Sequence, residues 1–326
     1  MADGTRDALA GGAPLVSVAI TAYHSAAWLP RAIESALRQQ AGFPIEIVIG
    51  DDCSADDTAR ILQDYQQRYP SVVRVLQRTE RLGMQRNFYD VFEQCQGKYI
   101  AWLDADDSWT DPQKLALQVA VLEADNSVSV CGHFVRQVSP AGAVIHECCP
   151  SRPAGRYRLR DIIATNFVPS PTILFRNGVQ RSLPPSFFSL TGVVDWPILL
   201  QSALVGDILL LDRVMADYVL MPGSAYQGKG PLYQDEIDLE FYAMAEQILP
   251  QPWQRAIRAA KGIRYDAISY HLLKQGQRAG GRSAALLAFC LPHPLDNIVS
   301  KFRALALAAV FHPVERLRRG FRSLKK

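Results

Sequence analysis

The residues best suited to chemistry in this sequence are acids that directly follow an apolar run. Residues 97–111 are Gly-Lys-Tyr-Ile-Ala-Trp-Leu-Asp-Ala-Asp-Asp-Ser-Trp-Thr-Asp, in which residues 99–103 have the length and the aromatic and β-branched content of a buried strand. In open α/β sheets, ligands bind at the carboxyl ends of the strands, and two carboxylates one residue apart can share a hard divalent cation. Asp104 and Asp106 therefore indicate a cation site that would bridge to phosphate.

An ordinary turn and helix start would also explain this acidic stretch. Asp111 and Pro112 supply the residues of a helix start, with Asp at the N-cap and Pro at the first helical position, so Asp104, Asp106 and Asp107 are not needed for capping. Both interpretations stay open on this stretch alone.

The flanking sequence predicts strands that alternate with helices. Apolar strands are expected at residues 15–21, 45–50, 72–77 and 99–103, with one-sided helical patterns around residues 29–37, 61–69 and 88–95. Such alternation implies right-handed parallel crossovers, which place the loops after Thr21, Gly50 and Leu103 along one edge of the sheet. Because Asp51 and Asp52 follow the second strand, two acidic loops are expected to converge on one crevice.

The rest of the chain divides into a continuation of this domain and a helical region. We expect a helix at 112–124, strands at 128–138, 167–175, 208–211 and near Tyr218, and a helix that begins at Asp195 and stops at Gly206. The segment 144–166 allows no assignment. The predicted organisation is a disordered leader at 1–13, an α/β domain with a mostly parallel, doubly wound sheet at 14–228, and a helical appendage at 229–326 with breaks at 250–252 and 292–294.

Composition limits the classes of function. The chain has 326 residues, 35 Lys and Arg against 32 Asp and Glu, and a net charge of +3, which with no nucleic-acid motif predicts no nucleic-acid partner. The six cysteines have neither zinc-site spacing nor the density of a disulfide scaffold, which favours a reducing compartment. No signal peptide or membrane-spanning run is recognisable, so we expect a cytoplasmic protein.

The last residues of the chain form a basic amphipathic pattern. Val314, Leu317, Phe321 and Leu324 share one helical face, which is surrounded by Arg316, Arg318, Arg319, Arg322, Lys325 and Lys326. This pattern suits an interfacial helix on anionic lipid at the inner face of the cell membrane. A solvated helix docked on its own domain remains the alternative.

Five features in order resemble the inverting family 2 glycosyltransferases, which have a GT-A fold. The resemblance covers about residues 14–227 and rests on the following features: Val-Ser-Val-Ala-Ile-Thr-Ala-Tyr-His at 16–24, Asp-Asp-Cys-Ser at 51–54, the loop 83–87, Asp-Ala-Asp-Asp at 104–107, and Asp195-Trp196. Trp109, Lys114-Leu115 and Gln118 follow the acidic motif as they do in many bacterial members. Each feature alone is weak, and their order makes the match specific.

The resemblance implies a role for each matched residue. Thr21 and Tyr23 would contact the nucleotide base, and Asp52 would accept its N–H. Arg86 would bind the diphosphate, where a guanidinium can form paired hydrogen bonds with phosphate oxygens. The remaining roles belong to three acids: Asp106 as the direct ligand of Mg²⁺ or Mn²⁺, Asp104 shared between the metal and the ribose or a bound water, and Asp195 as the catalytic base.

Each of these residues also has a simpler explanation. Tyr23 could fill a loop by packing, Asp52 could cap a helix, Arg86 could be a surface charge, and Asp195 could be an N-cap. The chain also departs from the family pattern. Where many relatives have Arg and His near the end of the domain, this chain has Val219 and Met221, and a thioether is a poor ligand for a hard cation.

The sequence therefore predicts a metal-dependent, inverting glycosyltransferase. It would move a sugar from a nucleotide diphosphate-sugar to a hydroxyl of a glycan or glycolipid, in bacterial surface-polysaccharide or lipopolysaccharide assembly. A sugar nucleotidyltransferase is the second hypothesis, although residues 23–27 lack the glycine-rich loop that such an enzyme needs. A catalytically inactive nucleotide-binding module is the third.

Overall fold

The computed structural model describes residues 12–224 and 229–291, which form two compact units. The first comprises residues 12–189 and 194–221, and the second comprises the described residues from 190–193 and from 222 onward. The predicted boundary at 228 falls in the stretch 225–228, outside the described residues. Most of the leader, the break at 292–294 and the basic segment from Val314 also lie outside them.

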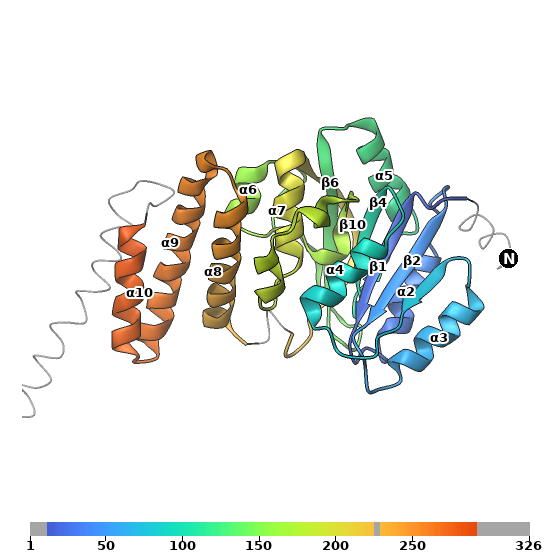
Figure 1. Cartoon of the computed structure of the whole chain (residues 1–326), viewed down its shortest axis with the longest axis horizontal. Helices are drawn as coiled ribbons and strands as arrows, with labels where there is room; N and C mark the ends of the chain where they lie inside the picture. Colours follow the sequence, from blue (N-terminus) through green and yellow to red (C-terminus); the bar gives the residue numbers. More distant parts are fainter. Residues whose placement is uncertain (1–11, 225–228, 292–326) are drawn as a thin grey trace, which may run out of the picture. The chain divides into compact units, whose positions relative to one another are not determined.

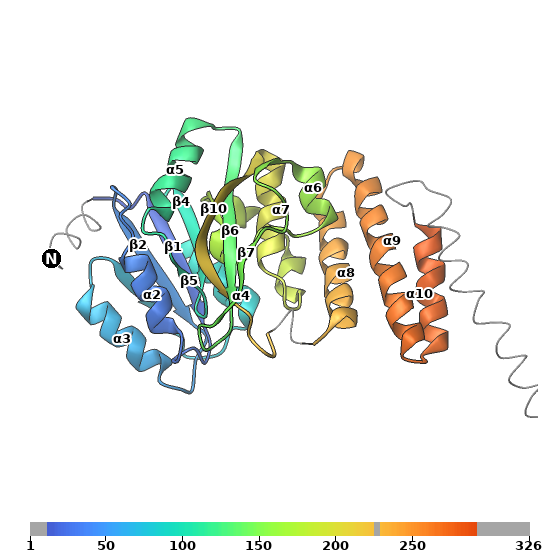
Figure 2. The ribbon, with the colours of Figure 1, turned by 180° about the vertical axis from the view of Figure 1, so that it is seen from behind.

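A ten-stranded sheet forms the first unit (Figures 1 and 2). Its strands are β1 Val16–Ala22, β2 Ile45–Asp51, β3 Val73–Leu76, β4 Tyr99–Asp104, β5 Ser108–Trp109, β6 Val128–Val138, β7 Val144–Cys149, β8 Gly155–Tyr157, β9 Leu174–Arg176 and β10 Asp207–Val219. Their order is β3-β2-β1-β4-β9-β6-β10-β5, with β7 beside β6 and β8 beside β10. The pairs β3-β2, β2-β1 and β1-β4 are parallel, which confirms the predicted crossovers.

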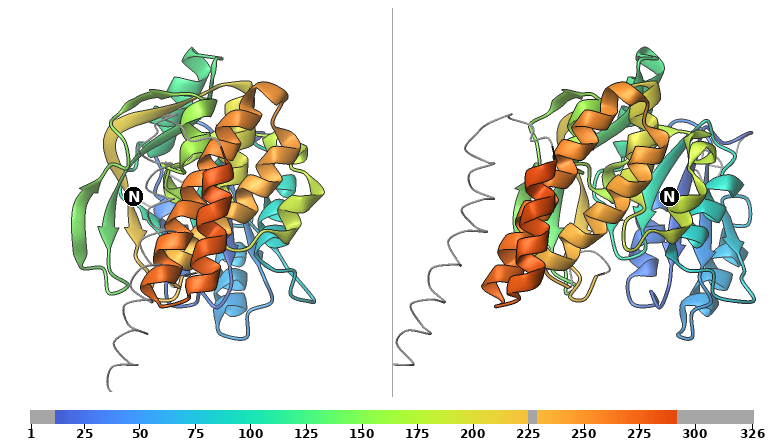
Figure 3. Two further views of the ribbon diagram at one scale, coloured as in Figure 1. Left: turned by 90° about the vertical axis from the view of Figure 1, so that its left-hand side faces the viewer. Right: turned by 60° about the vertical axis from the view of Figure 1, so that its left-hand side comes forward.

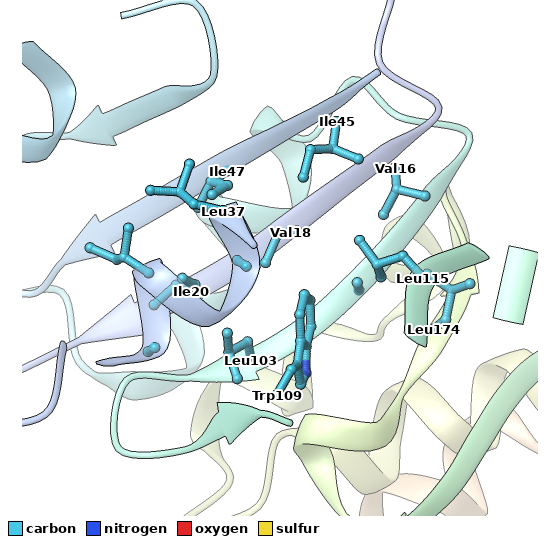
Figure 4. Close-up of a cluster of buried hydrophobic side chains, with 14 of the residues drawn as sticks. Val16, Val18, Ile20, Leu37, Ile45, Ile47, Leu103, Trp109, Leu115 and Leu174 are labelled. Atoms are coloured by element: carbon cyan, nitrogen blue, oxygen red, sulfur yellow. The ribbon is translucent and has the colours of Figure 1, made fainter. Parts of the chain in front are cut away.

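Helices cover both faces of this sheet. They are α2 Leu29–Leu37, α3 Thr58–Arg68, α4 Met84–Gln94, α5 Lys114–Ala124, α6 Leu159–Ala164 and α7 Asp195–Val205. One face packs on α2, α3 and α5 through alternate strand residues such as Val18, Ile47 and Leu103 (Figure 4). On the other face, the Trp102 ring lies 5.0 Å from that of Phe92 on α4.

Several predicted boundaries are wrong. Residues 167–175 were expected to be one strand, yet a 3-10 turn occupies Ser170–Thr172 and only Leu174–Arg176 forms a paired strand, because Pro169 and Pro171 lack the N–H groups that a strand pairs. Residues 208–211 and Tyr218 belong to one long strand, β10. Helix α5 begins at Lys114, two residues later than predicted, and Asp111 Oδ1 accepts from the Gln113 N–H over 2.8 Å just before it.

The second unit is helical among its described residues. It contains α8 Pro231–Ile248, α9 Gln251–Lys274 and α10 Arg278–Cys290 (Figure 3). The predicted break at 250–252 separates α8 from α9, and a second break at 275–277 was not predicted. A nearly buried ion pair joins α8 to α9, with 2.9 Å between Arg264 Nε and Asp238 Oδ2. No helix in the described ranges is both long and apolar enough to cross a membrane.

Candidate active site

The strand register brings the carboxyl ends of β1, β2 and β4, which the acidic loops follow, to one edge of the sheet. Thr21, near the end of β1, pairs with Gly50 of β2 on one side and with Asp104 of β4 on the other. This register confirms that the loops after these three strands converge. Non-glycine residues with positive φ also occur in two of the loops, at His24 and Cys53, and such backbone is concentrated at functional sites.

Two side-chain donors fix the orientation of Asp104. The indole Nε1 of Trp102 donates to Oδ1 over 2.9 Å, and the hydroxyl of Ser170 donates to Oδ2 over 2.5 Å. Trp102 precedes Asp104 by two residues on the same strand, whereas Ser170 comes from the turn before β9. The carboxylate is thus held from both sides while it remains partly exposed.

Asp106 and Asp107 occupy different environments. Asp106 is partly exposed, whereas Asp107 is 1% exposed and accepts a hydrogen bond from the Val219 N–H over 2.8 Å. The guanidinium of Arg31, on the first turn of α2, donates to the backbone oxygen of Asp106. Asp106 is therefore accessible to a ligand, whereas Asp107 links the acidic loop to the end of β10.

Asp195 is the first residue of α7. Val194 occupies the N-cap position and no side chain caps the helix, so the alternative role of Asp195 as an N-cap does not apply. Its Oδ1 accepts from the backbone N–H of Trp196 and its Oδ2 from the Asn166 side-chain amide, each over 2.8 Å. The carboxylate is partly exposed and each oxygen has one fixed donor.

The electrostatics show that these acids share one site. Burial raises the pKa of Asp195 to about 6, and the charge of Asp104 also raises it. Burial, followed by the charge of Asp104, raises the pKa of Asp106 to about 6. Burial raises the pKa of Asp107 well above its usual value, and burial followed by the Asp107 charge raises that of Tyr218. Such concentrated negative charge favours a cationic ligand.

Tyr23 and Asp52 lie beside each other at the other end of this edge. The guanidinium carbon of Arg81 lies 3.9 Å from the centre of the Tyr23 ring, and Arg81 Nε lies 3.5 Å from Asp52 Oδ2. Asp52 Oδ1 also accepts from the backbone N–H groups of Leu82 and Gly83. Gly83 has a φ of +83°, which a residue with a side chain would adopt only with strain. The structure thus groups Tyr23, Asp52 and Arg81.

Arg86 has a different neighbour. Its guanidinium carbon lies 4.6 Å from the centre of the Phe188 ring, and its side chain is exposed. Phe188 also packs edge-on against Tyr89 of α4. This arrangement leaves the guanidinium at the surface of α4.

Asp104 and Asp106 fit a divalent cation that a phosphate-bearing ligand helps to hold. Hard cations prefer carboxylate oxygens, and Mg²⁺ is commonly held by one or two carboxylates together with waters and substrate phosphates. The described residues contain no group of three or more His, Cys, Asp and Glu side chains arranged to hold a metal. The assignment of a divalent cation to this site therefore rests on two carboxylates, the desolvated one of Asp106 and the neighbouring one of Asp104.

Sequence reasoning missed three residues of this site. Asn166 lies in the segment that allowed no assignment, Ser170 lies in a stretch predicted to be a strand, and Tyr218 was predicted only as part of a strand. The signal that could have located the first two is the pair of prolines at 169 and 171, which predicts a loop rather than a strand.

Comparison with known proteins finds a family match for the part of the chain that carries Asp104 and Asp106. Residues 17–178 match the model described as Glycosyl transferase family 2. An uncharacterised protein of Mycobacterium tuberculosis is 32% identical over 206 residues, which cover 62% of this chain and 58% of that protein. The succinoglycan biosynthesis protein ExoO of Rhizobium meliloti is 26% identical, with 92% of this chain and 89% of ExoO covered.

Solved structures share the fold. TarS of S. aureus, in complex with UDP-GlcNAc, is similar with a TM-score of 0.66 and 20% identity, over 94% of this chain and 92% of that one. The mannosyltransferase PcManGT of Pyrobaculum calidifontis, in complex with GDP-Man and Mn²⁺, has a TM-score of 0.58 and 18% identity, over 91% and 81%. The predicted GT-A fold with a helical C-terminal part is confirmed.

Proposed function

The domain at residues 17–178 belongs to glycosyl transferase family 2, and from this premise we propose that the chain transfers a sugar from a nucleoside diphosphate-sugar to an acceptor hydroxyl, with inversion at the anomeric carbon. One observation carries this proposal: Asp104, Asp106 and Asp195 are partly exposed residues whose carboxylates belong to one electrostatically coupled site. Two of them suit the donor diphosphate with its cation, and the third suits proton removal.

Asp195 is the proposed base. Its carboxylate takes the proton of the acceptor hydroxyl while the acceptor oxygen forms a bond to the anomeric carbon. The bond from that carbon to the diphosphate oxygen breaks on the opposite side, and the nucleoside diphosphate leaves with the electron pair. A pKa of about 6 keeps Asp195 ionised at neutral pH and makes it a stronger base than an ordinary aspartate.

Asp106 and Asp104 are the proposed ligands of Mg²⁺ or Mn²⁺. When bound, the cation would neutralise charge on the departing diphosphate. The desolvation of Asp106, beside the fixed carboxylate of Asp104, supports this assignment. The Mn²⁺ complex of the similar mannosyltransferase is consistent with it.

Thr21, Tyr23 and Asp52 are the proposed contacts for the nucleotide base, and Arg86 is the proposed contact for the diphosphate. The Tyr23 ring stacks on that of His24, with 4.1 Å between the ring centres, and Arg81 lies over it at 3.9 Å, so a base can stack on this ring only if one of the two moves away. Asp52 can accept a base N–H beside it. Arg86 must leave the Phe188 ring to reach a phosphate, so its assignment depends on movement of that side chain.

The proposed acceptor is a glycan or glycolipid of the bacterial cell surface. The named function of ExoO in succinoglycan biosynthesis supports this class. We also propose that the enzyme acts on the cytoplasmic side of the membrane, to which its basic C-terminal segment attaches.

Nucleoside diphosphate release tests the proposal. UDP-GlcNAc and GDP-Man serve as probe donors, because the similar structures hold them. We expect one of them to release UDP or GDP with Mn²⁺ and not with EDTA, and the same nucleotide to raise the melting temperature in the presence of Mn²⁺.

The two alternatives give different results. A nucleotidyltransferase would release pyrophosphate from a nucleoside triphosphate and a sugar phosphate. An inactive binding module would show the thermal shift without any release. Either result would overturn the proposed transfer.

A further inference from the structure

One short segment contacts both ends of the candidate active site. The Asn166 amide donates to Oδ2 of Asp195, and four residues later the Ser170 hydroxyl donates to Oδ2 of Asp104. These two acids belong to different elements, since Asp104 ends β4 and Asp195 begins α7. The segment that holds them, residues 166–170, lies between α6 and β9.

Residues 166–170 are themselves firmly fixed. The side-chain oxygen of Asn166 accepts a hydrogen bond from the Val168 N–H, and this bond directs the side-chain nitrogen of Asn166 toward Asp195. The Thr172 hydroxyl donates to the Pro169 oxygen, and Trp109 Nε1 donates to the Pro171 oxygen. Val168 is 1% exposed. Both ends of the segment are therefore anchored, independently of any ligand.

We propose that Asn166 and Ser170 are positioning residues, which set the orientations of the proposed base and of the donor-side acid from one rigid segment. This inference rests on the proposed function. It assigns the two residues distinct effects, because Asn166 acts on the proton-transfer step and Ser170 acts on donor binding.

The geometry at Asp195 explains the first effect. An ionised carboxylate has about four lone-pair sites, and the Trp196 N–H and the Asn166 amide each occupy one of them on different oxygens. The carboxyl group is thereby prevented from rotating, and its remaining lone pairs keep a constant direction toward an acceptor hydroxyl. Without Asn166, Oδ2 loses its side-chain donor and the carboxyl group is held only by backbone N–H groups at the start of α7.

The geometry at Asp104 explains the second effect. Trp102 and Ser170 hold its two oxygens, so the carboxylate has one orientation before any cation arrives. Partners of ligand residues are typically responsible for a 10-fold to 100-fold effect on metal affinity. Ser170 should therefore influence cation-dependent nucleotide binding.

The first experiment compares Asn166→Ala with Asn166→Asp, which keeps the shape but replaces the donor by an acceptor. With the probe donor that the wild type turns over, we expect kcat to fall by roughly 10-fold to 100-fold in both variants, while the Kd for UDP or GDP with Mn²⁺ stays within a factor of about two.

A matched structural control is Asn177→Ala. This asparagine also lies in the first unit, but its amide donates to the backbone oxygens of Cys95 and Gly97. We expect it to lower the melting temperature without lowering kcat. Equal kcat values for wild type, Asn166→Ala and Asn166→Asp would overturn the role of Asn166, as would equal losses in Asn166→Ala and Asn177→Ala.

The second experiment measures Ser170→Ala by calorimetry with Mn²⁺ and UDP or GDP. A roughly 10-fold weaker Kd is expected, and an unchanged Kd would overturn the role of Ser170.

Failure of the inference differs from failure of the proposed function. If Asp195→Asn is inactive while Asn166→Ala is fully active, only the inference is wrong, whereas full activity in Asp195→Asn refutes the proposed base itself.

Discussion

Individual carboxylates in this protein differ because their neighbours differ. Asp106 and Asp107 are adjacent in sequence, yet Asp106 is partly exposed and Asp107 is buried against the Val219 N–H. Burial raises the pKa of both. The accessible member is suited to a ligand, whereas the buried member ties the acidic loop to β10.

Asp106→Asn tests the cation assignment at this scale. We expect the Mn²⁺-dependent affinity for UDP or GDP to fall by roughly 100-fold or more, since loss of a ligand should exceed the effect of losing its partner. The folded protein should not be less stable at neutral pH, because the folded-state pKa of about 6 lies above the unfolded value. At neutral pH the ionisation of Asp106 therefore lowers the free energy of unfolding. Unchanged affinity, or full-rate transfer in EDTA, would contradict the assignment.

The pH dependence of kcat/KM tests the ionisation of Asp195. A base must be deprotonated, so the rate should rise with pH and reach half its plateau near the pKa of about 6. A bound cation offsets the negative charge of Asp104, so saturating Mn²⁺ should move the midpoint toward lower pH. Initial rates between about pH 4.5 and pH 8 measure this curve, and a rate that falls across that interval would argue against a carboxylate base.

Sequence motifs predict which acids belong to the candidate site, but they do not predict the hydrogen-bond partners of these acids. The resemblance indicated Asp104, Asp106 and Asp195 because these positions match family motifs. Asn166 and Ser170 could not be found this way, because their role depends on hydrogen bonds between segments that lie 29 and 66 residues apart. Such contacts arise only when the sheet is assembled.

Among the elements, those with a clear apolar period were predicted well. Residues 128–138 form β6 with the expected bounds, because a long stretch rich in valine and without proline favours a strand. The segment 144–166 contains β7, β8 and α6, which are short. Short elements carry too few periods to stand out, and β7 is exposed along most of its length, so it has no buried face that would give an alternating pattern.

Helix α5 carries a buried lysine, from which an element-scale prediction follows. Lys114 is 0% exposed, donates to the Gln118 side chain over 2.8 Å, and lies 4.1 Å from the centre of the Trp109 ring. Burial lowers the pKa of Lys114 to about 7, whereas its ordinary value is 10.5. Between these values the unfolded chain binds more protons than the folded one, so the group makes stability increase with pH.

Lys114→Met removes this titration. The melting temperature of the wild type, relative to that of the variant, should therefore increase between about pH 7 and pH 9.5. Comparison at each pH cancels the contributions of other groups. A constant difference across this interval would show that the lysine keeps its ordinary pKa in the folded protein.

The whole molecule combines a unit that carries the site with a helical unit of its own. The carboxylates of the candidate site and Asn166 lie in the first unit, as do the proposed contacts of the nucleotide base, which are Thr21, Tyr23 and Asp52. The second has separate internal contacts, such as the pair of Asp238 and Arg264. The sequence predicts a helical region after the α/β domain from the change to long helical patterns, but it gives no reason for residues 190–193 to group with the second unit.

The basic C-terminal segment, which lies outside the described residues, gives a prediction for the whole chain. Each basic residue near an anionic surface contributes about 1 kcal/mol, so the cluster from Arg316 to Lys326 should attach the protein reversibly to membranes. We expect the full chain to co-sediment with anionic liposomes, less so at high salt, and a chain ending at His312 to remain in solution. Equal co-sedimentation of the full chain and the shortened chain would show that the segment does not attach the protein to membranes.

The most direct test of the central claim is the transfer rate of Asp195→Asn at saturating donor and Mn²⁺. The substitution keeps the shape of the side chain and one oxygen for the Asn166 amide, at the cost of the bond from the Trp196 N–H, and it cannot take the proton of the acceptor hydroxyl. We predict a loss of roughly 10²-fold to 10⁴-fold in rate, with the melting temperature and nucleotide affinity close to those of the wild type. Near-normal transfer by a stable Asp195→Asn protein that binds donor would contradict the account.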